Sequence, residues 1–243
     1  MPGRGASVAG ASAYARYRSL RAEYRQERVL ARLAVAGFVA AMTAGLFDWP
    51  TGLSAGLAVF LLHACYLRVK PDPATRWRRG AVAERRTGRR LSRLDPAYFH
   101  VLHDRALPAD SRANLDHLVV GLTGVYAIVS RRWRPLTRLR VVDQRLCAGP
   151  RPVTRLAMTA RATARTVGER LSAELGHPVE VDAIIAVHGT RMPRAGIVLD
   201  GVTVQRAKRT RRLIERQPAV FTTAQVAAIA AAAERILPPM IDV

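Results

Sequence analysis

Two uninterrupted apolar runs stand out in the N-terminal third of the chain. Residues 29–47, VLARLAVAGFVAAMTAGLF, contain one early charge, Arg32, and residues 53–67, LSAGLAVFLLHACYL, follow directly after DWPTG. A helix needs about 20 apolar residues to cross a bilayer, so each run is close to that length. The pattern predicts a two-helix transmembrane hairpin over residues 29–69. The alternative is a helical hairpin packed onto a soluble domain.

The residues around these runs predict an orientation. Residues 1–28 and the stretch RVKPDPATRWRRG after the second run are rich in arginine, whereas the connecting loop holds Trp49 and no base. Positive charge is retained on the cytoplasmic side of a membrane, and tryptophan gathers at the interfaces. We therefore expect a multi-pass protein of the cell membrane, with residues 1–28 as a basic cytoplasmic segment and both termini in the cytoplasm.

From residue 76 onward the pattern changes to short apolar runs that alternate with amphipathic stretches. This order predicts a domain over residues 76–243 of the α/β class, with a mixed central sheet flanked by helices. The expected helices are 78–94, 152–175, 206–217 and 222–237, and the expected strands are 98–107, 113–120, 125–132 and 179–189, followed by a hairpin over 196–205.

A β-hairpin in this domain carries an acid inside an apolar run, in NLDHLVVGLTGVYAIVSRRW. If residues 121–124 form the turn, Asp116 lies opposite Val129, and Asn114 lies opposite Arg131. Side chains alternate along a strand, so these four side chains are expected on one face of the hairpin.

Charge and cysteine content narrow the classes of partner and site. The formal net charge is +21, with 39 basic and 18 acidic residues. Such a charge favours nucleic acid or an anionic membrane surface, although a bias toward arginine alone gives the same value. The two cysteines form neither a disulfide framework nor a zinc-binding spacing.

Several basic residues are candidates for contact with phosphate groups. A sequence-independent grip on a DNA or RNA backbone is one interpretation of the basic helix, and a solvated face or attraction to anionic lipid is the other. The candidates are Arg131, Arg132, Arg206, Lys208, Arg209, Arg211 and Arg212.

Three segments, RGAVAERRTGRRL, VLHDRALPADSRANLDHLVVG and GVYAIVSRRW, resemble the nuclease-related domain (NERD) family. The resemblance covers about residues 79–190 and implies a nuclease core of the PD-(D/E)xK type. Family members commonly read close to NIDHLVVGPxGVFVIDSKxW in the hairpin. The family's helix glutamate then matches Glu84 and its first strand acid matches Asp116, while the second acid falls at Val129 and the lysine at Arg131.

The resemblance implies phosphodiester hydrolysis with Mg²⁺ or Mn²⁺ held by the carboxylates. Val129 offers the metal no oxygen, and arginine cannot replace lysine because it stays charged. Arg131 can instead grip a phosphate or pair with Asp116. We therefore expect a nucleic-acid-associated, catalytically degenerate protein.

Two alternatives remain beside that expectation. One is an active metal-dependent nuclease that uses Glu84 and Asp116 with a relocated acid, and the other is a membrane-bound scaffold for protein contacts. Candidates for the relocated acid are Glu169, Glu180 and Asp182. Asp104 is interpreted as a strand-end residue that bonds the following backbone.

Overall fold

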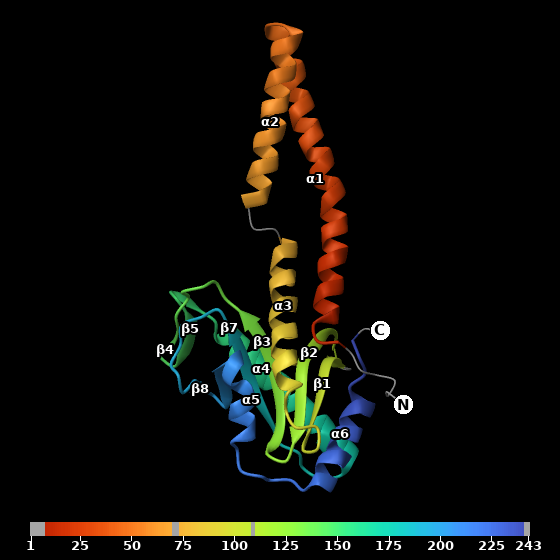
Figure 1. The fold of residues 1–243 in the computed structure, drawn as a ribbon, viewed down its shortest axis with the longest axis vertical. Coiled ribbons are helices and arrows are strands. Elements are labelled where there is room, and N and C mark those ends of the chain that lie inside the picture. Colours follow the sequence, from red (N-terminus) through yellow and green to blue (C-terminus); the bar gives the residue numbers. More distant parts are fainter. Residues whose placement is uncertain (1–7, 70–72, 108–109, 241–243) are drawn as a thin grey trace. The chain divides into compact units, whose positions relative to one another are not determined.

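A computed structural model describes residues 8–69, 73–107 and 110–240. The chain divides into two units: residues 13–78 form the hairpin unit, and residues 1–12 together with 79–243 form the α/β unit. Figure 1 shows the elements of both units. Parts of three predicted features lie outside the described residues, namely 1–7 of the basic N-terminal segment, 70–72 of the basic stretch after the second apolar run, and 108–109 in the connection between the first two strands.

The hairpin unit consists mainly of α1 (Ala11–Leu46) and α2 (Trp49–Val69). Glycines allow the two helices to approach closely. A side chain at Gly52 would place its Cβ 2.6 Å from the Ala40 carbonyl oxygen, and one at Gly56 would lie 2.8 Å from the Ala40 Cβ. Small residues at such contacts are typical of helices packed within membranes.

Large apolar side chains on these helices face away from the contact. Leu30, Phe38, Leu57 and Leu62 are each more than half exposed. Among the described residues one segment, Val29–Leu46, is long and apolar enough to cross a membrane. The described part of α2 does not pass the same test, so the second span stays a prediction. Polar residues such as His63 reduce the hydropathy of α2.

The α/β unit is built on one six-stranded sheet with the order β1-β2-β3-β7-β9-β8. Strands β3, β7 and β9 are parallel, whereas the pairs β1–β2, β2–β3 and β8–β9 are antiparallel, so the predicted mixed sheet is confirmed. The strands are β1 (Phe99–Leu107), β2 (Asp110–Gly121), β3 (Gly124–Arg132), β7 (Val181–His188), β8 (Ile197–Leu199) and β9 (Val202–Arg206).

Helices cover both faces of this sheet, as Figure 1 shows. On one face, α4 (Thr154–Leu175) and α6 (Thr223–Ile236) contribute to the larger apolar core. On the other face, α3 (Pro73–Leu91) and α5 (Ala207–Glu215) contribute to a smaller core. The fold class expected from the apolar pattern is therefore correct for the α/β unit.

A second sheet of three short strands was not predicted. It consists of β4 (Leu139–Val142), β5 (Arg145–Ala148) and β6 (Arg151–Pro152). The turn between β4 and β5 uses positive φ at Asp143 and Gln144, at 47° and 56°. Hairpin turns of this kind are normally signalled by Asn-Gly or Asp-Gly, and Asp-Gln gives no such signal.

Candidate functional site

The β2–β3 hairpin has the predicted register. Val120 lies opposite Val125, and the regular pairing continues to His117 opposite Ile128. Beyond this point the Asp116 carboxylate accepts a hydrogen bond from the backbone N–H of Ser130, at 2.6 Å. The side chain of Asp116 therefore satisfies a backbone donor at the place where the regular pairing ends.

A second acid, Asp104, lies opposite Asp116 on the neighbouring strand. His103 pairs with His117, and Arg105 pairs with Leu115, so Asp104 falls between these partners. The backbone of Asp104 has a φ of 49°, which is uncommon for a residue other than glycine.

The burial pattern of β2 corrects the predicted face of the hairpin. Leu115 and Leu118 both belong to the core beneath α4 and α6, although strict alternation would place them on opposite faces. Asn114 instead directs its amide toward Asp104, at 3.4 Å from Oδ1. Val129 packs against the α4 and α6 core, so Asn114 and Val129 do not share one regular face.

The residues just before the hairpin unit cover these acids. We call residues 8–12 the N-terminal strap. The Ser12 backbone N–H and hydroxyl donate to the two oxygens of Asp104, at 2.7 and 2.5 Å. Gly10, with a φ of 72°, lies so close to α3 that a Cβ would be 3.3 Å from Oε2 of Glu84. Asp104 therefore bonds a segment far away in sequence, and its interpretation as a strand-end residue that bonds the following backbone is wrong.

We refer to Glu84, Asp104 and Asp116 as the carboxylate cluster. All three are buried. Burial, reinforced by the charges of Asp116 and Asp104, raises the pKa of Glu84 to about 8. Burial also raises the pKa of Asp116 to about 6, although Arg131 and the Ser130 N–H oppose the shift. Burial therefore favours the protonated form of Glu84.

Arg131 acts on this cluster through space. Its guanidinium donates to the Ser130 carbonyl at 3.1 Å. No ion pair within 4.0 Å joins Arg131 to Asp116 in the described part of the chain. The predicted ion pair between Arg131 and Asp116 is therefore not formed at contact distance. Arg131 acts on Asp116 from further away, by lowering its pKa.

The side chains present do not fit a divalent metal ion. Mg²⁺ and Mn²⁺ need oxygen ligands from ionised carboxylates. Val129 supplies none, a proton favoured by burial would have to leave Glu84, and the oxygens of Asp104 and Asp116 already accept hydrogen bonds from the chain. Within the described residues, no three His, Cys, Asp or Glu side chains are grouped to hold a metal ion.

The acids considered as replacements lie elsewhere. Glu169 is exposed on α4, where it pairs with Arg165 at 2.7 Å. Asp182 lies opposite Tyr126 near the start of β7, whereas Arg131 lies opposite Val187 near its end. Glu180 directly precedes β7, at that same distant end of the strand. The acid that lies near Glu84 and Asp116 is instead Asp104. Its negative charge contributes to the raised pKa of both residues.

Three histidines, of which His117 is buried and the other two half-buried, line the α3 side of the cluster. The Nδ1 atoms of His103 and His117 lie 2.9 Å apart, and His117 Nε2 lies 3.3 Å from the Ser130 hydroxyl. On the same side, His188 Nε2 lies 2.9 Å from the Thr87 hydroxyl. Burial lowers the pKa of His103 and of His188 to about 4 and that of His117 well below its usual value. The lowered pKa values favour neutral imidazoles, and the contact of His188 with Thr87 joins the end of β7 to α3.

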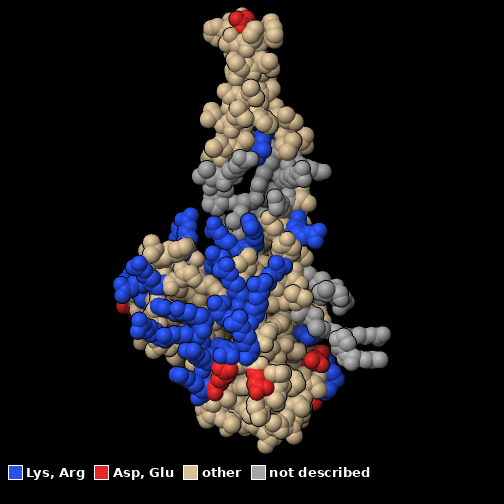
Figure 2. Space-filling view, in the orientation of Figure 1, with Lys and Arg blue, Asp and Glu red and all other residues tan. Residues whose placement is uncertain are grey.

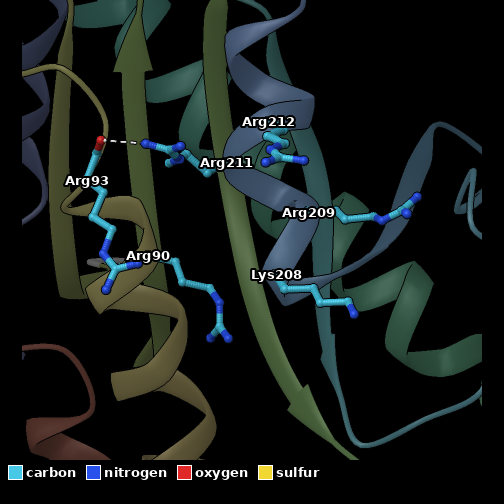
Figure 3. A pocket seen from close by; sticks show the side chains of 6 residues that line it. All are labelled: Arg90, Arg93, Lys208, Arg209, Arg211 and Arg212. Atoms are coloured by element: carbon cyan, nitrogen blue, oxygen red, sulfur yellow. Dashed lines mark hydrogen bonds between the residues drawn. The ribbon is translucent and has the colours of Figure 1, made fainter.

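A separate group of basic side chains surrounds a hollow of about 400 Å³ between the end of α3 and α5. Figure 3 shows two of these side chains coming from the α3 end and four from α5. The lining residues are Arg90, Arg93, Lys208, Arg209, Arg211 and Arg212.

The hollow contains four of the basic residues predicted to contact phosphate, Lys208, Arg209, Arg211 and Arg212, and adds two that were missed. Arg206 turns elsewhere and donates to the Met192 carbonyl at 2.5 Å. Arg131 and Arg132 are not among the residues that line the hollow. The missed residues belong to RRTGRRLSR, where arginines recur at helical spacing.

Comparison with known protein families gives one match. Residues 79–188 match the model of a family described as nuclease-related domain, NERD. This range contains the carboxylate cluster, Val129 and Arg131, and it excludes α5 and the N-terminal strap. No curated protein and no solved structure matches the chain.

Proposed function

Residues 79–188 form a nuclease-related domain, and from this premise we propose that the chain is a membrane-anchored, nucleic-acid-associated protein with an impaired phosphodiesterase site. The observation that carries the proposal is the state of the carboxylate cluster. Its two aspartates accept hydrogen bonds from the chain itself, and burial raises the pKa of Glu84, which favours its protonated form. Acids in this state are poorly suited to hold a cation.

The residues that depart from the family pattern support the same proposal. Val129 packs against the apolar core beneath α4 and α6, so the second acid of the family pattern has no counterpart here. Arg131 cannot deprotonate water because its guanidinium stays charged. The guanidinium can still bind a phosphate through its several donors. The domain thus keeps phosphate-binding chemistry and lacks groups to activate a nucleophile.

A cleavage assay on the full chain in detergent tests this function. We expect no metal-dependent cutting of DNA or RNA by the wild-type protein with Mg²⁺ or Mn²⁺. The double substitution Val129→Asp with Arg131→Lys restores the family pattern and is expected to produce cutting. Cleavage by the wild-type protein that disappears in Asp116→Ala would show that the site is active and the proposal wrong.

A second candidate function is an active nuclease in which Asp104 replaces the missing acid. It is supported by the position of Asp104 opposite Asp116 and by its effect on the pKa of Glu84. In that case Asp104→Asn abolishes metal-dependent cutting as fully as Asp116→Asn does. Ser12→Ala, which releases one oxygen of Asp104, then increases cutting.

The membrane anchor is the other half of the proposal. It is supported by the apolar segment Val29–Leu46 and by the exposed leucine and phenylalanine side chains on both helices. We propose that α1 and α2 both cross the membrane and that the α/β unit lies in the cytoplasm. The protein should then stay in the membrane fraction after alkaline carbonate extraction.

Labelling with a membrane-impermeant thiol reagent tests the two spans. In a chain with Cys65→Ser and Cys147→Ser, a cysteine introduced by Trp49→Cys should be labelled from outside the cell. A cysteine introduced by Arg155→Cys, on α4, should be labelled only after the membrane is opened. Equal labelling of both positions in intact cells would contradict the proposed topology.

A further inference from the structure

The basic hollow between α3 and α5 is one of three that adjoin one another on the α/β unit. A second hollow, of about 330 Å³, shares Arg209 and Arg212 with it and adds Arg194 and Arg216. A third, of about 640 Å³, shares Arg93 and extends along α3 past Arg89 and Arg85. The hollows adjoin at these shared side chains, and we call the three together the basic groove.

Very little negative charge accompanies these cations. None of the residues that line the three hollows, among those the structure describes, is acidic. Arg211 has Glu215 at 3.6 Å as an ion-pair partner. Figure 2 shows Lys and Arg side chains gathered over this face of the α/β unit, with few acids between them. A surface with closely spaced positive charges and few negative ones attracts an anionic ligand.

Contacts with backbone carbonyl groups hold two arginines across the boundaries between elements. Arg211 donates to the Arg93 carbonyl at 3.0 Å, so it bridges α5 and the end of α3 (Figure 3). Arg209 donates to the Arg194 carbonyl at 2.7 Å, on the side of the second hollow. Carbonyl acceptors position the side chains without neutralising their charges, and Glu215 is the acid that pairs with Arg211.

We infer that the basic groove binds the phosphate backbone of double-stranded nucleic acid without reading its sequence. This inference rests on the proposed function and assigns the binding to a site other than the carboxylate cluster. The continuity of the three hollows favours an extended polyanion over a compact polyphosphate. No Phe, Tyr or Trp among the described residues lines the groove, and proteins that hold single strands stack bases on such rings.

Substitution of the arginines that the hollow between α3 and α5 shares with its two neighbours tests the inference. Arg93 lines both the first and the third hollow, and Arg212 lines both the first and the second. Both side chains are exposed. Arg93→Gln with Arg212→Gln therefore removes two charges from the places where the hollows join. Arg155→Gln with Arg161→Gln removes the same charge from exposed positions on α4, against the opposite face of the sheet. The full chain in neutral detergent is titrated with fluorescent DNA duplexes of increasing length.

We expect the wild-type protein to bind more tightly as the duplex lengthens, until the groove is filled. The groove variant should bind about tenfold more weakly or worse, and the slope of log K against log salt should fall by about 1.8, or about 0.9 for each lost phosphate contact. The α4 variant should bind as the wild type does. Arg93→Lys with Arg212→Lys keeps both charges and should retain most of the affinity, while unchanged circular dichroism shows that each variant is folded.

Other results would overturn the inference in distinguishable ways. If the wild type binds duplex and the groove and α4 variants bind equally well, the groove is not the site, but nucleic-acid association stands. If tripolyphosphate binds as tightly as duplex and duplex length has no effect, the ligand is a compact anion. Tighter binding of single strands contradicts the assignment to duplex. If the wild type binds anionic vesicles and no nucleic acid, both the inference and the proposed function are wrong.

Discussion

The carboxylate cluster and the basic groove lie in the same unit and use charge in opposite ways. In the cluster, acids are buried and accept hydrogen bonds from Ser12 and Ser130. In the groove, cations face solvent, and the bonds that hold Arg209 and Arg211 go to neutral carbonyl groups. Phosphate binding and metal-assisted cutting are separate abilities. The difference supports our proposal that this domain binds phosphate groups and has an impaired site for metal-assisted cutting.

Burial explains why the two sites differ so strongly. A buried carboxylate is stabilised only by donors that the protein supplies, so its charge is either neutralised by a proton or committed to hydrogen bonds. Exposed arginines stay hydrated and remain available to an incoming anion. Substitutions in the two sites should therefore differ in their effect on stability, most strongly at Glu84.

Glu84→Gln should produce the largest change in stability, and only at high pH. The folded pKa of Glu84, about 8, lies above the ordinary value of 4.5, so the folded state holds a proton that the unfolded state releases. The stability of the wild-type protein should therefore fall as pH rises from about 4.5 to 8. Glutamine removes this loss and should raise the free energy of unfolding at pH 9 by roughly 2–4 kcal/mol, with little change at pH 4. Urea denaturation at both pH values measures the difference, and identical pH profiles for the two proteins would mean that Glu84 is not held protonated.

Asp116→Ala should destabilise the fold by about 1–3 kcal/mol because it leaves the buried N–H of Ser130 without its acceptor. Asp116→Asn keeps a carbonyl oxygen at the same position and should cost less. The comparison of the two variants by urea denaturation at pH 7.5 isolates the hydrogen bond from the charge. Equal losses would show that the backbone contact is not what stabilises Asp116.

Ser12→Ala should cost about 1 kcal/mol, since one of two donors to Asp104 is lost and the backbone donor remains. Hydrogen exchange at the N-terminal strap should become faster. Ser19→Ala on α1, where the hydroxyl donates only to the Arg16 carbonyl, is the matched control. If Ser12→Ala lowers the free energy of unfolding no more than Ser19→Ala does, the hydrogen bond from Ser12 contributes little to holding the strap.

The smallest effect on stability is expected in the basic groove. Arg93→Gln with Arg212→Gln should change the free energy of unfolding by less than about 0.5 kcal/mol, because exposed side chains without buried partners contribute little. A large loss in thermal denaturation would show that the groove arginines stabilise the fold, and the contrast with the cluster would then disappear.

The sequence was sufficient for the features that depend on local pattern. The register of the β2–β3 hairpin was predicted because its turn and its apolar alternation lie within a few residues of each other. The turn of the β8–β9 hairpin was predicted from Asp200-Gly201, and both residues have positive φ. The helix ending at Gly176 was predicted as well, because glycine adopts the left-handed conformation found there.

The features that were missed depend on contacts between distant segments. No local pattern places Ser12 beside Asp104, which lies 92 positions further along the chain. The contributions of Arg90 and Arg93 to a groove with α5 become visible only when the sheet brings two distant segments of the chain together. The positive φ of Asp104 likewise has no signature in VLHDRALP. The loss of alternation between Leu115 and Leu118, on which the predicted face of Asn114 depended, has none in NLDHLVVG.

The N-terminal strap has a consequence for how this protein can be divided. Residues 1–12 belong to the α/β unit, so the hairpin is an insertion within that unit's chain. A shortened protein that starts at residue 79 would lose the donors of Ser12 and the close cover of Gly10, and its acids would be uncovered by the truncation itself. Joining residue 12 to residue 79 through a flexible linker would remove the apolar helices while keeping the strap covalently attached to the unit whose acids it covers.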